Sequence, residues 1–331
     1  MFRFNPAIVL FIGFELCYYL LIAQTGIVEV FHSDIRLIAF LPIGGVLGTY
    51  LSSHIKLKEN YKVGILLSSQ ALLTLLYPDF NFLALFLLGL AVGGMAPLIV
   101  NSVKKANNID LLFSLCIAYA AGTFLFNTDP LQRGTLGVVL SVIPLISYFF
   151  IDMIKIENIK KQQDSYLSYT LPIMTFWVFL DSTLFETLSR DIHMSIWRDG
   201  YTTEIMVFHI IGVIAGVFLK LNHFQKSLTT LILFSLSYLA YFLREPLVLS
   251  ILYPIVISYY NVLILQSMSK IKSLKTIGIY MVFIGWIASG AGLFVALEGF
   301  ILYVPLLFMV AFLYMINQQN YISNNKEAYN G

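Results

Sequence analysis

The sequence predicts an all-α polytopic membrane protein with twelve transmembrane helices, arranged as two pseudo-symmetric six-helix halves. First, its 331 residues are 59% hydrophobic and only 11% charged, whereas a soluble domain carries about 25% charge. Second, twelve apolar segments are long enough to cross a bilayer, which takes about 20 residues in a helix. Third, short patterns recur in the two halves of the chain at a nearly constant separation.

Short polar loops separate the twelve apolar segments. In the first half these segments lie at residues 6–28, 36–54, 62–78, 81–103, 110–127 and 134–152. In the second half they lie at residues 167–188, 204–222, 226–243, 246–268, 275–297 and 299–317. This order predicts an N-terminal half (1–152), a cytoplasmic linker (153–166), a C-terminal half (167–317) and a polar cytoplasmic tail (318–331), for which we expect disorder.

The basic residues predict the orientation of these helices. If both termini are cytoplasmic, fifteen Lys and Arg residues lie on the inner side, including every lysine. The outer side then holds only Arg36, Arg133, Arg190, Arg198 and Arg244. Because basic residues favour the cytoplasmic side, we expect a multi-pass protein of the inner (plasma) membrane. The net charge of +2 then reflects topology, and we expect no nucleic-acid partner.

Three pairs of matching positions indicate that one half of the chain is a duplicate of the other. The pairs are Glu15 and Asp181, 166 residues apart, Gly44 and Gly212, 168 apart, and Ala121 and Ala291, 170 apart. Inverted or parallel repeats with a polar site between them are typical of secondary transporters. The repeat therefore predicts a transport protein with its site between the halves.

Two acidic residues lie near the middle of their apolar segments, Glu15 in the first and Asp181 in the seventh. A charged side chain at this depth costs about 2.5–3.5 kcal/mol, so such residues face a polar cavity or a partner. Tyr18 and Tyr19 follow Glu15, and Trp177 lies one helical turn before Asp181. We predict that these five residues form a substrate cavity with proton-coupling acids. The alternative is a protonated carboxyl group in a structural hydrogen bond, for example to a tyrosine.

The predicted spans hold Lys and Arg only at their ends and none in their interior. Carriers of phosphorylated or dicarboxylic solutes usually need a cation in the site, so a small cationic, zwitterionic or neutral solute fits better, helped by cation–π contacts. We therefore predict a proton-coupled secondary active transporter, for instance a symporter, working by alternating access. The sequence has no nucleotide-binding glycine loop and no metal-finger spacing, so we expect no cofactor and no enzyme. It leaves the oligomeric state open.

Other polar residues and prolines in the spans suggest moving parts. Glu186 and His209 fall at similar outer depths in the seventh and eighth segments, which predicts an outer gate or proton relay. Pro97 and Pro254 lie inside the fourth and tenth segments, where each removes a backbone hydrogen bond and could act as a hinge.

Three other functions remain open. Met174, Met206, His209 and Cys17 could form a path for copper or another soft metal, although Met and Cys more often fill cores. The outer loop Ser189–Thr203 holds Arg190, Asp191, His193, Arg198 and Asp199, which suggests an outer-interface intramembrane enzyme, although such loops are more often salt-bridged lids. A non-transporting membrane scaffold is the third alternative.

The six-plus-six arrangement, the cytoplasmic middle loop and the acid in the first helix of each half resemble the major facilitator superfamily, over Phe4 to Met315. This resemblance implies that segments one, four, seven and ten line the cavity. The family motif Gly-x-x-x-Asp-Arg-x-Gly-Arg is reduced to a glycine and one basic residue in the stretch from Gly48 to Lys56. The family's arginine of segment four and Gly-Pro signature of segment five are missing, which implies a divergent, compact member and not a drug antiporter.

Overall fold

The computed structural model describes residues 4–31, 35–151, 171–191 and 193–330, and the secondary structure of these residues is helical throughout. The N-terminal half consists of α1 (Pro6–Tyr18), η1 (Tyr19–Gly26), α2 (Ile27–Phe31), α3 (Ile35–Ile38), α4 (Phe40–His54), α5 (Glu59–Thr74), α6 (Phe82–Val103), α7 (Asn108–Phe126), η2 (Pro130–Gln132) and α8 (Arg133–Ile151). The predicted linker, 153–166, lies outside the described residues.

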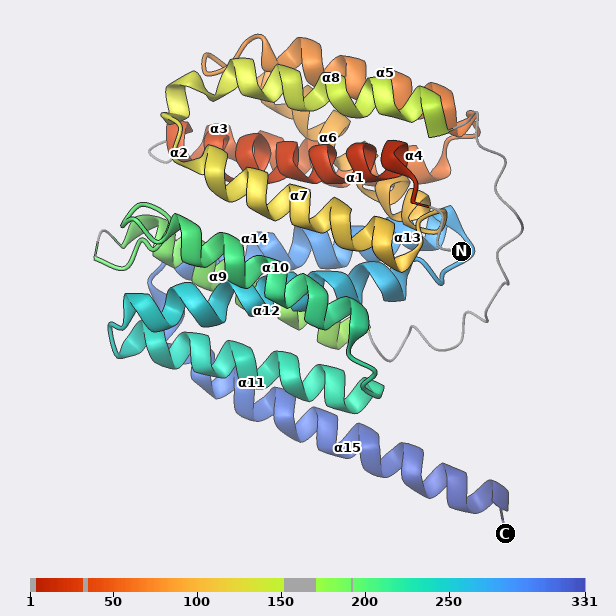
Figure 1. The fold of residues 1–331 in the computed structure, drawn as a ribbon, viewed down its shortest axis with the longest axis vertical. Helices are drawn as coiled ribbons and strands as arrows, with labels where there is room; N and C mark the ends of the chain where they lie inside the picture. Colours follow the sequence, from red (N-terminus) through yellow and green to blue (C-terminus); the bar gives the residue numbers. More distant parts are fainter. Residues whose placement is uncertain (1–3, 32–34, 152–170, 192, 331) are drawn as a thin grey trace.

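The C-terminal half consists of α9 (Leu171–Arg190), α10 (Thr202–Phe218), α11 (His223–Phe242), α12 (Pro246–Met268), α13 (Leu274–Met281), η4 (Val282–Ile287), α14 (Ala288–Leu297), η5 (Phe300–Tyr303) and α15 (Val304–Asn330). In Figure 1 the helices of the two halves lie above and below one another, with α7, α10 and α14 near the boundary. This arrangement confirms the predicted fold of twelve helical segments.

Asparagine residues begin several of the helices. The side chain of Asn81 accepts a hydrogen bond of 2.8 Å from the amide of Ala84 at the start of α6. Asn107 and Asp110 form a capping box at the start of α7. These side chains satisfy backbone amides that have no partner inside the helix, and they place the helix starts at the ends of the apolar segments.

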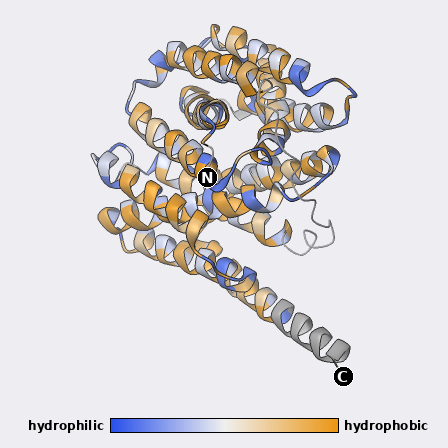
Figure 2. Cartoon of the chain, turned by 45° about the vertical axis from the view of Figure 1, so that its right-hand side comes forward, coloured by the Kyte–Doolittle hydropathy of each residue, from blue (hydrophilic) through white to orange (hydrophobic). Residues whose placement is uncertain are grey.

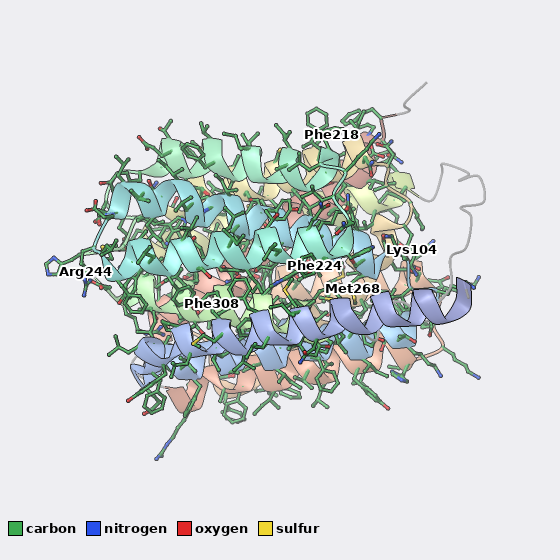
Figure 3. The ribbon with its side chains drawn as sticks, turned by 90° about the horizontal axis from the view of Figure 1, so that it is seen from below. Lys104, Phe218, Phe224, Arg244, Met268 and Phe308 are labelled. Atoms are coloured by element: carbon green, nitrogen blue, oxygen red, sulfur yellow. The ribbon has the colours of Figure 1, made fainter. Side chains whose placement is uncertain are left out.

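Nine helical segments of the described chain are long and apolar enough to span a membrane. Helix α10 is apolar but has only 17 residues, and the more polar α5 and α11 complete the twelve. Hydrophobic residues cover the outer surface of the bundle, as Figure 2 shows, and side chains such as Leu72 and Phe149 are exposed there. Arg244 and Lys104, predicted on opposite sides of the membrane, lie at opposite ends of the bundle (Figure 3).

Glycines that recur in the sequence allow close helix packing in both halves. A Cβ atom on Gly44 would lie 2.9 Å from the carbonyl carbon of Phe86, so α4 packs directly on α6. On Gly212 it would lie 2.5 Å from the carbonyl oxygen of Ile255, and α10 packs on α12 in the same way. Small residues allow such close approach of helices, so the repeated glycines fix equivalent helix pairs.

The C-terminal tail differs from the expectation. Helix α15 continues to Asn330 and thus through the segment predicted to be disordered. No glycine or proline lies between Leu306 and Asn330, and each residue added to an existing helix gains a backbone hydrogen bond without a new nucleation step. The polar composition of the tail was therefore a poor guide to its backbone conformation. Figure 1 shows α15 projecting away from the bundle.

Candidate functional site

A cavity of about 250 Å³ lies between the two halves. Helices α1, η1 and α7 line it from the N-terminal half, and α9, α12 and η4 from the C-terminal half. Its ionisable and aromatic lining residues include Glu15, Asp181, His209, Tyr19, Tyr119 and Tyr260. The two acids predicted from the repeat therefore line one cavity, although they come from different halves.

Two tyrosines of α12 hold the carboxyl group of Asp181. The hydroxyl of Tyr253 donates to Oδ1 at 2.7 Å, and that of Tyr260 donates to Oδ2 at 2.6 Å. Each oxygen keeps a further lone pair, and the side chain is only half-buried. Sequence reasoning missed both tyrosines, although their seven-residue spacing places them on the same face of a helix.

Glu15 lies in a more closed environment, with 1% of its surface exposed. Its Oε2 accepts a hydrogen bond of 3.0 Å from Nε2 of Gln70 on α5. The same nitrogen lies 3.3 Å from Oγ of Ser141, and Gln70 Oε1 has no hydrogen-bond partner among the described residues. The ion pairs recorded for the described part of the chain include neither Glu15 nor Asp181.

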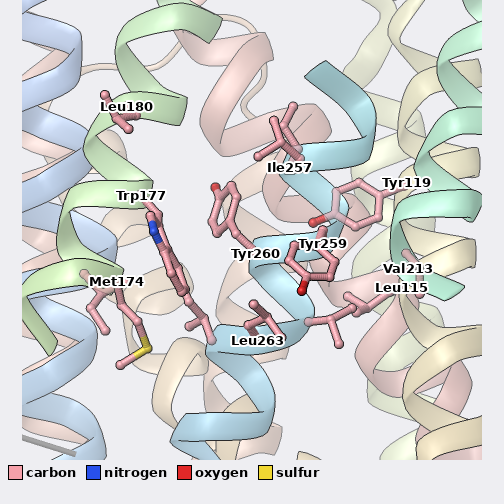
Figure 4. Packing of buried hydrophobic residues seen from close by; sticks show 14 of the residues in the cluster. Leu115, Tyr119, Met174, Trp177, Leu180, Val213, Ile257, Tyr259, Tyr260 and Leu263 are labelled. Carbon is pink, nitrogen blue, oxygen red and sulfur yellow. The ribbon is translucent and has the colours of Figure 1, made fainter. Parts of the chain in front are cut away.

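Only one of the three predicted aromatic residues lines the cavity. Tyr19 does, but Tyr18 turns toward α5, where its hydroxyl lies 2.6 Å from Oγ1 of Thr74. Successive residues of a helix point in different directions, and here the rotation of the helix directs Tyr18 to Thr74 and Tyr19 to the cavity. Trp177 packs behind the cavity beside Tyr260, with 6.5 Å between ring centroids (Figure 4).

Glu186 and His209, the predicted outer gate or proton relay, have other partners in this structure, and a gate role for them stays a prediction. Glu186 pairs with Arg190 one turn away in α9, at 3.0 Å. His209 lines the cavity, where its Nδ1 lies 2.6 Å from Oγ of Ser258 and its ring stacks on Tyr119 with 4.5 Å between centroids. The close packing of α10 on α12 brings His209 against Ser258.

The predicted hinge residues lie in the interior of their helices. Pro97 is buried within α6 and Pro254 within α12, and both helices continue past the proline. Neither proline lines the cavity. A hinge role for them stays a prediction.

The predicted soft-metal ligands are not brought together on the cavity. Of these four residues only His209 lines it, while Cys17 and Met174 are buried in hydrophobic clusters and Met206 is half-buried. The described residues contain no group of three or more His, Cys, Asp or Glu that could hold a metal ion.

Two π-helical segments contribute to the cavity, and sequence reasoning found neither. Segment η1 supplies Tyr19 and Gln24, and η4 supplies Trp286. The indole Nε1 of Trp286 donates to Oγ1 of Thr49 at 2.9 Å, across the boundary between the halves. Its ring fills a notch at Gly45, where an added Cβ atom would overlap the indole ring. Such wide turns are frequent at functional sites.

Glu29 joins the two halves near their predicted outer end. Its Oε2 lies 3.1 Å from Nη1 of Arg133, whose side chain is 1% exposed, and its Oε1 lies 2.6 Å from Nη2 of Arg198, whose side chain is 51% exposed. Arg133 belongs to the N-terminal half and Arg198 to the loop after α9. In the same loop Asp191 pairs with Arg244, so several of the charges that suggested an enzyme take part in ion pairs.

Replacing Arg198 by alanine should open the cavity more often to the outside, because it removes the ion pair that links the halves there. An exposed ion pair contributes about 0–1 kcal/mol, so the effect should be at most about fivefold. The measurement is the labelling rate of a cysteine at the cavity-lining Thr123 by an impermeant thiol reagent, with Cys17 and Cys116 changed to serine. Arg190→Ala is the matched control, since that pair lies within α9. An equal rate in both variants would show that the Arg198–Glu29 ion pair does not hold the outer end closed.

Comparisons with solved structures identify the fold. FucP, a major facilitator superfamily transporter in an outward conformation, matches with a TM-score of 0.58 and 14% identity over 94% of this chain and 97% of that chain. The fucose:proton symporter of E. coli matches with a TM-score of 0.60 and 14% identity over the same shares of the two chains. A bacterial homologue of the iron transporter ferroportin, in an outward-facing state, matches with a TM-score of 0.55 and 15% identity over 96% of this chain and 100% of that chain. No protein-family model matches the sequence, and no curated protein matches it.

Proposed function

We propose that this chain, which has the major facilitator superfamily fold, is a proton-coupled secondary active transporter of a small solute. The observation that carries the proposal is that Glu15 and Asp181, one from each half, line a single cavity at the boundary between the halves. Intramembrane acids with these surroundings mark proton and substrate pathways in general. No Lys or Arg is among the described residues that line this cavity.

The contacts between the halves support alternating access. Arg198 and Glu29 meet near the predicted outer end, and Trp286 and Thr49 meet between η4 and α4. Each is a single polar contact, which can separate when one half rocks against the other. Burial disfavours the charged form of a carboxyl group, so protonation of either acid would change its contacts and bias that rocking.

The substrates of the similar structures are not carried over to this chain. One of these proteins is a fucose:proton symporter and another is a homologue of an iron transporter, so the shared fold accommodates unlike solutes, and function has to be argued from the site. The arrangement of His209, Cys17, Met174 and Met206 gives copper transport little support. Proton coupling therefore rests on the two acids of this chain.

We also propose that both termini are cytoplasmic and that the protein lies in the inner (plasma) membrane. The support is the distribution of basic residues, fifteen against five, together with the separation of Lys104 and Arg244 to opposite ends of the bundle.

The test is proton uptake into proteoliposomes that hold the purified protein. A panel of amines, amino acids, neutral metabolites and copper is added to the wild type and to Asp181→Asn. We expect at least one compound to drive proton movement in the wild type and none in the variant. Glu298→Gln, which changes an exposed acid outside the cavity, should behave like the wild type. If the wild type and Asp181→Asn move protons equally, coupling through Asp181 is wrong.

A further inference from the structure

The two cavity acids differ in how far the solute can reach them. Asp181 is half-buried and faces the cavity, whereas only 1% of the surface of Glu15 is exposed. Both oxygens of Asp181 accept hydrogen bonds from phenol groups, and each can accept one more. Asp181 is thus a fixed acceptor that a bound solute can touch.

Several polar groups of the cavity lining already donate hydrogen bonds within the protein and not toward a solute. Tyr260 donates to Asp181, Ser182 donates to the carbonyl of Ser289 at 2.8 Å, and Trp286 donates to Thr49. Asn261 donates to the carbonyl of Ile257 at 3.0 Å. A polyol or sugar needs donors as well as acceptors from its site, whereas an ammonium group needs only acceptors.

A carboxylate on the solute would lack a counter-charge. No Lys or Arg is found among the described lining residues. His209 is the remaining basic side chain there, and it is occupied by Ser258 at one ring nitrogen and by Tyr119 on one ring face. Burying an unpaired carboxylate is costly, which disfavours amino acids and other zwitterions.

The rest of the cavity suits an apolar body with one positive charge. Leu16, Leu20 and Phe185 supply apolar contacts, and Tyr19 and Trp286 supply aromatic rings from opposite halves. Aromatic faces attract cations. A volume of about 250 Å³ is below the usual range for drug-sized ligands, about 300–1,000 Å³, so the solute is small.

From these contacts we infer that the transported solute is a small organic monocation, an amine with an apolar body, whose ammonium group binds at Asp181. This inference rests on the proposed transport function and narrows its substrate to one chemical class. Glu15, of which only 1% of the surface is exposed, is then left as the proton site. The two acids of the repeat have different tasks because their surroundings differ.

The test compares three probes of one shape and different charge: 2-phenylethylamine, 2-phenylethanol and phenylacetate. Binding to the purified protein is followed by tryptophan fluorescence, because Trp197 and Trp286 line the cavity, with Trp177→Phe removing the third tryptophan. We expect the amine to bind at least about tenfold more tightly than the alcohol, and phenylacetate not to bind, since a charged hydrogen bond is stronger than a neutral one.

Asp181→Asn should remove the preference for the amine and leave the weak binding of the alcohol unchanged. Asp181→Glu, which keeps the charge, should retain the preference. This variant provides the test if Asp181→Asn does not fold. The inference is overturned if the alcohol binds as tightly as the amine, if Asp181→Asn weakens both equally, or if none of the probes binds. Proton uptake driven only by neutral compounds would also overturn it while leaving the transporter proposal intact. Amine binding at Asp181 without proton movement would support the amine site and contradict the proposal of proton-coupled transport.

Discussion

Replacing Glu15 by glutamine should abolish accumulation of the solute against its gradient. The new side chain has the same shape but cannot take up or release a proton. Its amide oxygen can still accept the hydrogen bond that Gln70 Nε2 donates to Glu15 at 3.0 Å, so we expect the protein to fold. Downhill entry should suffer less than accumulation, because Glu15 is closed off from the solute. The measurement is the steady-state solute ratio across proteoliposomes with an imposed proton gradient.

Glu298→Gln is the matched control for this experiment. It makes the same chemical change at an exposed residue that does not line the cavity, and it should accumulate solute like the wild type. Accumulation by Glu15→Gln to the wild-type ratio would show that the proton passes elsewhere. A variant at Gln70 gives a second test. The side-chain Oε1 of Gln70 has no hydrogen-bond partner in the described part of the chain, and it can accept the hydrogen bond that a protonated Glu15 donates. Gln70→Leu should weaken coupling in the same direction.

Replacing Gly44 by alanine should destabilise the N-terminal half by about 1–3 kcal/mol, the usual cost of overpacking. The added Cβ atom would overlap the carbonyl oxygen of Phe86 and lie 3.0 Å from the amide nitrogen of Leu90. Both are backbone atoms, so α4 and α6 would have to move apart. Gly212→Ala should have a similar effect in the C-terminal half, where α10 meets α12. The measurement is the thermal unfolding midpoint of the purified protein in detergent.

Gly290→Ala provides the control for both glycine variants. Gly290 also lies in a helix, α14, but an added Cβ atom would meet nothing within 4 Å. Alanine stabilises a helix relative to glycine by about 1 kcal/mol, so this variant should unfold at the same temperature or higher. If the unfolding midpoint of Gly44→Ala is no lower than that of Gly290→Ala, the close packing of α4 on α6 does not limit the stability of the protein.

The fold was largely predictable because the bilayer constrains the sequence directly. Each span needs an apolar segment of sufficient length, and the repeated glycines marked α4 and α10 before their partners were known. The exception is the predicted tail 318–331, where a polar composition predicted disorder but helix α15 continues to Asn330. Composition indicates how much apolar surface a segment can bury. It does not indicate whether a helix that enters the segment ends there.

The site was predictable only in part. Glu15, Asp181 and Tyr19 were found because acids in a membrane are costly and the repeat marked two of them. Glu186 and His209 have the partners Arg190 and Ser258, and Trp177 and Tyr18 lie outside the cavity lining. These differences share one cause, since depth along a helix can be estimated from the sequence, but the direction of a side chain depends on how the helix is rotated against its neighbours.

The sequence by itself thus determined that the chain spans a membrane, that it is built from two related halves, and that each half carries one acid near the middle of its first apolar segment. Hydrophobicity, spacing and charge are local quantities, and they are readable without knowing what lies beside each helix. Only the tertiary structure decided that Tyr253 and Tyr260 hold Asp181, that Gln70 holds Glu15, and that Arg198 reaches Glu29. Each of these contacts joins residues far apart in the chain, and it exists only because helix packing brings them within hydrogen-bonding distance.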